Sequence, residues 1–288
     1  MKLVKYSIIL AKISIVRLNP TSLKLRGTSR EPSPCSLFLF LYFDRFVNTC
    51  YCTVMNSKLE FIIDRDYDAR MIYEMLVAQK KSKDLEYQSE NMGISLTVAK
   101  KIASVKSYKE AGEIIQPIVR GRYKELLPQL EKAREEYQKS WDKINNAFFE
   151  RLEELTRFPM QHKKFYCVIS AFHIGISNWG GNKIVRKYDE GADKQRKITA
   201  HELIISHIFS FARAKYPRAD DRKIWQLTEV YAFVITALDA KMRSLWPWEE
   251  KEINIGHNYP ELLPLQKKYA KVIASGNLKK YLAQGLKE

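Results

Sequence analysis

The sequence Thr199-Ala200-His201-Glu202-Leu203-Ile204-Ile205-Ser206-His207 decides the predicted fold, because it places chemically active side chains in the middle of an apolar helix. We expect this helix to span residues 194–214, since Pro217 follows closely and proline does not continue a helix. Residues four apart in a regular helix lie about 40° apart around its axis, and residues six apart lie about 240° apart. Ile205 therefore shares the face of His201, and His207 points away from it.

The segments on either side of this helix predict a small sheet and a second helix. Residues 164–172 are aromatic and β-branched, and turn residues at 179–182 precede a second apolar segment. This pattern predicts a β-hairpin or two strands of a small sheet. A second helix is expected between about residues 220 and 243, with an Asp at its N-cap, and it carries Glu229. Two shorter helices are expected near residues 259–274 and 278–286.

The order of sheet, helix with His-Glu, and second helix with a Glu resembles the core of the gluzincin (thermolysin-like) zinc metallopeptidases. In that family an H-E-x-x-H helix supplies two His ligands four residues apart, and its Glu acts on a zinc-bound water. The resemblance covers roughly residues 164–243, and His201, Glu202 and Glu229 match the pattern. It implies that His201 and Glu229 are zinc ligands and that Glu202 is the catalytic base.

Ile205 stands where the family has its second His, so the third zinc ligand must come from elsewhere. His207 is the candidate on the same helix, and it would reach the site only if the helix were bulged by nearly two residues. His173 and His257 are candidates from other segments. Two ligands without a third would bind Zn2+ weakly, because the fixed geometry that closes the site is lost. We therefore expect Zn2+ as the cofactor of an active form, with peptide hydrolysis impaired or lost in this chain.

The predicted fold class is α+β and predominantly helical, with a small β-sheet or hairpin packed beside the helix of His201 and the helix of Glu229. We expect three regions along the chain: a basic extension at residues 1–54, a helical region at 55–160 and a metallopeptidase-like domain at 161–288. Within the helical region, residues 108–156 carry a charged amphipathic pattern that Pro117 and Pro128 interrupt.

Residues 1–54 differ from the rest in composition, with eight Lys or Arg and two acidic residues. A basic, acid-poor leader is typical of an organellar transit segment. The alternative that we favour is a misassigned start, with the protein beginning at Met55. The apolar runs of the leader are shorter than the roughly 20 residues of a membrane span, so no span is expected. The chain has only four cysteines, which favours a reducing compartment, and we expect a cytoplasmic protein.

Three functions remain open from the sequence. The first is a metallopeptidase-like protein with impaired or lost hydrolysis, and the second is a non-catalytic binding or regulatory module on the same fold. Either would have a peptide or protein as its partner, and strand 165–170 could pair an extended peptide as a further strand. The third is a basic helical nucleic-acid-associated protein, because the net charge of +16 favours contact with nucleic acid.

Overall fold

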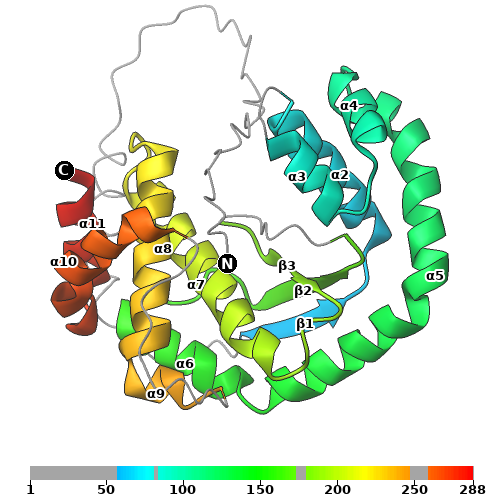
Figure 1. Cartoon of the computed structure of the whole chain (residues 1–288). Helices are drawn as coiled ribbons and strands as arrows, with labels where there is room; N and C mark the ends of the chain where they lie inside the picture. The colour runs from blue at the N-terminus through cyan, green and yellow to red at the C-terminus, as the bar shows by residue number, and fades with distance from the viewer. Residues whose placement is uncertain (1–56, 81–83, 173–179, 247–258, 288) are drawn as a thin grey trace, which may run out of the picture. The chain divides into compact units, whose positions relative to one another are not determined.

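The computed structural model describes residues 57–80, 84–172, 180–246 and 259–287 (Figure 1). Over these residues the fold is predominantly helical with one small three-stranded sheet, which confirms the expected α+β class. The strands are β1 (Lys58–Ile62), β2 (Lys164–Ser170) and β3 (Lys183–Lys187). The helices before β2 are α2 (Arg65–Ala78), α3 (Asp84–Asn91), α4 (Leu96–Ser104), α5 (Tyr108–Asp142) and α6 (Asn145–Thr156). The helices after β3 are α7 (Lys194–Lys215), α8 (Asp221–Leu238), α9 (Ala240–Arg243), the 3-10 turn η2 (Pro260–Leu262), α10 (Leu263–Ala274) and α11 (Leu278–Lys287).

The sheet has the order β1-β2-β3, and both strand pairs are parallel. Leu59 of β1 pairs with Phe165 of β2, and Cys167 of β2 pairs with Ile184 of β3. Of the two alternatives expected for this segment, the β-hairpin is therefore wrong, because a hairpin joins antiparallel strands, and the two strands of a small sheet are confirmed. The region at 55–160, expected to be helical, begins with a strand, so β1 was missed by the sequence analysis.

The glycine turn before β3 is bound to α7 by two side-chain hydrogen bonds. Gly180 has a φ of +78°, in the left-handed region that favours glycine. The hydroxyl of Ser210 donates to the carbonyl of Gly180 at 2.8 Å, and the hydroxyl of Ser206 donates to the carbonyl of Gly181. The chain therefore enters β3 from the surface of α7, in the same direction as β2.

The outer edge of β1 is closed by two side-chain amides. Gln138 of α5 accepts the N–H of Phe61 at 2.9 Å and donates to the carbonyl of Leu59 at 3.1 Å. Asn145 of α6 accepts the N–H of Leu59 at 3.2 Å and donates to the carbonyl of Ser57 at 3.0 Å. An unpaired strand edge would present these groups to other chains, so the two amides block strand addition here.

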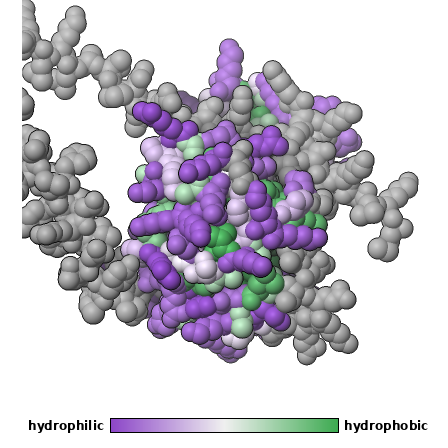
Figure 2. All heavy atoms as spheres, turned by 90° about the vertical axis from the view of Figure 1, so that its left-hand side faces the viewer, coloured by the Kyte–Doolittle hydropathy of each residue, from purple (hydrophilic) through white to green (hydrophobic). Residues whose placement is uncertain are grey.

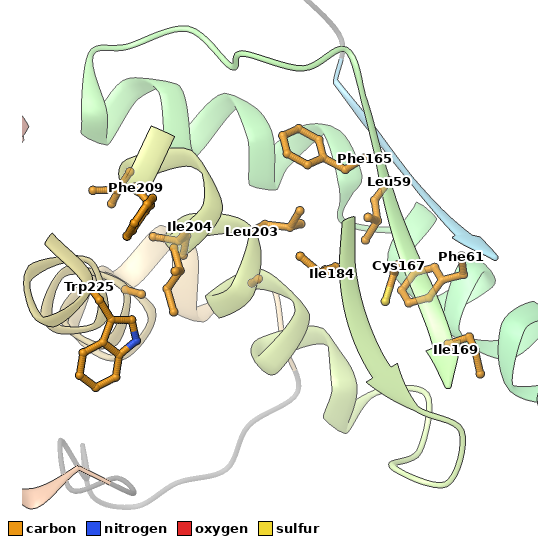
Figure 3. Close-up of a cluster of buried hydrophobic side chains, with 14 of the residues drawn as sticks. Leu59, Phe61, Phe165, Cys167, Ile169, Ile184, Leu203, Ile204, Phe209 and Trp225 are labelled. Atoms are coloured by element: carbon orange, nitrogen blue, oxygen red, sulfur yellow. The ribbon is translucent and has the colours of Figure 1, made fainter. Parts of the chain in front are cut away.

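Helix α7 is buried on most of its circumference, as expected of a helix in the centre of a fold. Leu203 faces the sheet residues Phe165 and Ile184, and Ile204 and Phe209 lie toward Trp225 of α8 (Figure 3). The predicted bounds of this helix agree with the structure to one residue. The second predicted helix begins where expected, with the Asp220 side chain accepting the N–H of Lys223 at 3.0 Å.

Helix α5 runs without interruption through Pro117 and Pro128, although the sequence analysis treated both as breaks. Its buried face includes Tyr123, Tyr137 and Trp141, and the helix curves past α2 and the sheet (Figure 1). Packing of this face compensates for the backbone hydrogen bonds that proline removes.

No helix among the described residues is long and apolar enough to cross a bilayer. The leader at residues 1–54, with its expected role as a transit segment or an upstream read-through, lies outside the described residues.

Candidate functional site

Two of the residues expected to bind zinc meet between α7 and α8. The Nε2 atom of His201 lies 3.0 Å from Oε2 of Glu229. Both side chains are largely withdrawn from water, with 13% of the His201 side chain and 6% of the Glu229 side chain exposed. The imidazole also lies against Phe233 of α8, with ring centroids 4.3 Å apart. The structure therefore brings His201 and Glu229 into direct contact.

The surroundings of His201 favour its charged form. Burial lowers the pKa of the imidazole, but the hydrogen bond and negative charge of Glu229, with the charge of Glu202, outweigh it and raise the pKa. In the protonated ring both nitrogens donate, so Nε2–H donates to the Glu229 carboxylate. The arrangement is a buried hydrogen-bonded pair, and a metal ion bound at Nε2 would compete with a proton for the same atom.

Glu202 is half-buried beside a second cluster of charges on β3. Arg186 is buried, and its Nε donates to Glu190 at 2.9 Å. Burial alone would lower the pKa of Arg186, but Glu190 and Glu202 together raise it. The negative charge of Glu202 also acts on Tyr259, whose pKa is raised mainly by burial. The charge of Glu202 therefore acts on both Arg186 and Tyr259.

Ile205 occupies the position of the missing His and belongs to the apolar core, with 2% of its surface exposed. The isoleucine side chain has no atom that could bind a metal ion, so this residue contributes only to the packing of α7.

His207 is buried in a different environment from His201. Its Nε2 lies 3.3 Å from Oγ1 of Thr156 at the end of α6, and its ring is 5.5 Å from that of Phe158. Burial lowers the pKa of His207 to about 4, so the ring is neutral at pH 7. The structure does not bring His207 to the His201–Glu229 pair, because α7 is regular and carries no bulge between them.

Within residues 57–80, 84–172, 180–246 and 259–287, no three His, Cys, Asp or Glu side chains are grouped so that they could hold a metal ion. The other candidate ligands, His173 and His257, lie outside the described residues. His201 and Glu229 could supply one nitrogen and one oxygen to a Zn2+ ion. Glu202, expected to be the catalytic base, is adjacent in sequence, and its charge acts on His201.

Three residues near the site were missed by the sequence analysis: Arg186, Glu190 and Tyr259. Arg186 and Glu190 are four residues apart, but only the fold shows that the charge of Glu202 acts on Arg186. Tyr259 follows a segment without a clear periodic pattern and packs edge-to-face on Trp225, with ring centroids 5.2 Å apart. The acidic residue four positions after Arg186 was the one local signal for this pair, since Arg186 lies in a strand that also carries Lys183 and Lys187.

Comparisons with protein-family models, with curated proteins and with solved structures found no match to this chain.

Proposed function

We propose that this chain is a metallopeptidase-like protein that has lost zinc-dependent hydrolysis and binds an extended peptide without cutting it. The observation that carries the proposal is the contact between His201 and Glu229, at 3.0 Å between Nε2 and Oε2. A His on one helix and a Glu on the next are the ligand types that the gluzincin resemblance implies. Glu202 beside them corresponds to the family's catalytic base.

The loss of hydrolysis is supported by the residues that would complete the site. Ile205 packs in the core, and His207 is held by Thr156. Catalytic zinc sites have three protein ligands and one open position for water. With His201 and Glu229 alone, the ion would be bound weakly and its water would not be fixed beside Glu202.

A peptide partner is supported by the edge of β3. The strand expected to receive the peptide, residues 165–170, is the central strand β2, so that part of the prediction is wrong. The edge of β1 is closed by Gln138 and Asn145. On β3, Asn182 accepts the N–H of Tyr166, so the backbone groups of Lys183 and Val185 point away from β2. An extended peptide would add as a strand at these two residues, beside α7.

Metal content of the purified full chain tests the loss of the zinc site. We expect less than a tenth of a zinc per chain by mass spectrometry (roughly, for a two-ligand site after dialysis), in wild type and in His201→Ala alike. About one zinc per chain in wild type, lost in His201→Ala, would contradict the proposal. In that case Glu202→Gln should retain zinc and lose peptide hydrolysis.

Peptide binding is tested with a fluorescein-labelled, reduced and carboxymethylated casein and the variant Val185→Pro. Proline at this position removes the outward N–H and leaves the hydrogen bonds to β2 intact, so we expect weaker binding with an unchanged fold. The matched control is Val185→Ala, which also removes the valine side chain but keeps the outward backbone N–H. Equal binding by Val185→Pro and Val185→Ala would exclude addition at β3.

The cytoplasm is the proposed location of this function. It is supported by the small number of cysteines and by Cys167, a free and buried thiol on β2.

A further inference from the structure

The two C-terminal helices, α10 and α11, have the most one-sided charge of the described chain. Residues 262–287 contain six lysines and no Asp, Glu or Arg. All six are exposed, and we call them the lysine face: Lys267, Lys268, Lys271, Lys279, Lys280 and Lys287. Several basic residues elsewhere in the described part of the chain form ion pairs with acidic ones, as in the Lys132–Glu136 pair of α5 and the Lys183–Asp64 pair.

The lysines lie on one side of each helix. At about 100° per residue, Lys267, Lys268 and Lys271 fall within an arc of about 100° on α10. Lys279, Lys280 and Lys287 fall within a similar arc on α11. The buried residues of each helix are on the opposite side: Gln266, Tyr269 and Ile273 on α10, and Leu278, Tyr281, Leu282 and Gly285 on α11.

Both helices pack on α8 through their buried sides and lie on the same side of the fold (Figure 1), so their lysine-bearing sides face away from α8. The hydroxyl of Tyr281 donates to the carbonyl of Leu227 in α8 at 2.7 Å. The ring of Tyr281 also packs on Tyr269 of α10, with centroids 5.2 Å apart, and on Tyr231 of α8. Figure 2 views the protein from the side on which α10 and α11 lie in Figure 1, and hydrophilic side chains cover most of the described surface there.

Five of these six charges are available to a partner. Among the described residues, Lys267, Lys271, Lys279, Lys280 and Lys287 form no ion pair. Lys268 lies over the ring of Tyr269, with Nζ 5.4 Å from the ring centroid, so it has a partner and is not counted among the available charges. The five other like charges on this surface repel one another, and a polyanion would relieve that repulsion.

We propose that the lysine face binds the phosphodiester backbone of double-stranded nucleic acid, without reading its sequence. Lysines on a rigid surface neutralise phosphates and release their counterions, which is the main source of sequence-independent affinity. Single strands are disfavoured because the tyrosines of both helices are buried and leave no aromatic platform for stacking bases. A membrane surface is disfavoured because the apolar residues of α10 and α11 pack inward, whereas an interfacial helix inserts its apolar side into lipid.

The lysine face shares no residue with the His201–Glu229 pair or with the edge of β3. Nucleic-acid binding therefore does not depend on the proposed peptide-binding function. The two can fail separately, since the variants that test one leave the residues of the other unchanged.

The test is fluorescence anisotropy of the full chain with a labelled 30-base-pair DNA duplex and an RNA duplex of the same sequence, between 50 and 200 mM salt. Five phosphate contacts predict that wild-type affinity falls roughly 500-fold over this range. The triple variant Lys279→Gln/Lys280→Gln/Lys287→Gln should lose about three contacts, so its affinity should fall only about 12-fold over the same range. The duplex that binds more tightly identifies the source of the phosphates.

The matched control is Lys109→Gln/Lys124→Gln/Lys132→Gln on α5, which removes the same net charge from exposed positions beside glutamates. We expect its salt dependence to equal that of wild type, and both triple variants to unfold at the wild-type temperature. Equal salt dependence in the two triple variants would show that net charge alone is responsible and would overturn the proposal. Binding to anionic vesicles without binding to either duplex would overturn it as well.

Discussion

The imidazole of His201 and the carboxylate of Glu229 form a buried contact between α7 and α8, with Nε2 and Oε2 3.0 Å apart. Because both side chains are withdrawn from water, each depends on the other to satisfy its charge. The contact links the two helices in the interior of the fold.

Removing one partner of this pair should destabilise the fold more than removing both. His201→Ala leaves the Glu229 carboxylate buried without its partner, and we expect a loss of about 3 kcal/mol in the free energy of unfolding. The double variant His201→Leu/Glu229→Leu replaces the pair with apolar side chains, and it should recover most of that loss. Urea denaturation monitored by circular dichroism measures both. A double variant less stable than His201→Ala would contradict this account of the pair.

Asp68 should make the stability of the protein depend on pH. Its Oδ2 accepts the hydroxyl of Tyr123 at 2.9 Å and the N–H of Ala171 at 3.1 Å, and burial raises the pKa of the carboxyl to about 6. The folded state therefore retains a proton that the unfolded state has lost, and this contribution is present below about pH 4 and is lost as the pH rises through 6.

An amide at position 68 keeps both hydrogen bonds and does not titrate. We expect Asp68→Asn to equal wild type near pH 4 and to exceed it by about 3 kcal/mol at pH 7, since two pKa units correspond to about that free energy. Denaturation curves of both proteins at pH 4 and pH 7 measure the difference. Asp68→Ala is the control that loses both hydrogen bonds, and it should be less stable than Asp68→Asn at either pH. An unchanging difference between wild type and Asp68→Asn would refute the titration of Asp68 in this range.

The two amides that close the edge of β1 should differ in their contributions. Asn145 is buried, and it also accepts the indole N–H of Trp141 at 3.0 Å. Asn145→Ala leaves several buried polar groups without partners, and we expect a loss of about 3 kcal/mol. Gln138 is partly exposed, so water can replace its amide, and Gln138→Ala should cost about 1 kcal/mol. Thermal and urea denaturation compare the two variants, and an equal cost would mean that burial does not control the contribution.

Gly285 should tolerate no side chain, because α11 packs directly on Leu227 of α8. A Cβ at this position would lie 2.4 Å from Cδ2 of Leu227, which is itself buried. We expect Gly285→Ala to cost about 1–3 kcal/mol, as overpacking does in a dense core. Gly121→Ala is the control: nothing lies within 4 Å of its Cβ position on α5, and it should stabilise the protein by about 0.5–1 kcal/mol. A neutral Gly285→Ala would show that α11 can move away from α8.

The sequence alone determined the parts of this structure that depend on neighbouring residues. The limits of α7 followed from its apolar pattern and from Pro217, and the start of α8 followed from the capping residue Asp220. The 3.6-residue period also separated His201 from His207, because six residues correspond to more than half a turn beyond one full turn. The pairing of His201 with Glu229 came from the resemblance to a family pattern and not from local periodicity.

The tertiary structure alone decided which distant segments meet. Leu59 and Phe165 are more than a hundred residues apart, and an apolar strand pattern does not specify the partner or its direction. For the same reason the sequence analysis missed β1 and left open whether β2 and β3 form a hairpin or two strands of a small sheet. The effect of Glu202 on Arg186 and the contact of His207 with Thr156 depend on how α7 packs against β3 and α6. Helix ends are encoded within a few residues, whereas strand order and the neighbours of a buried charge are set by the packing of the whole core.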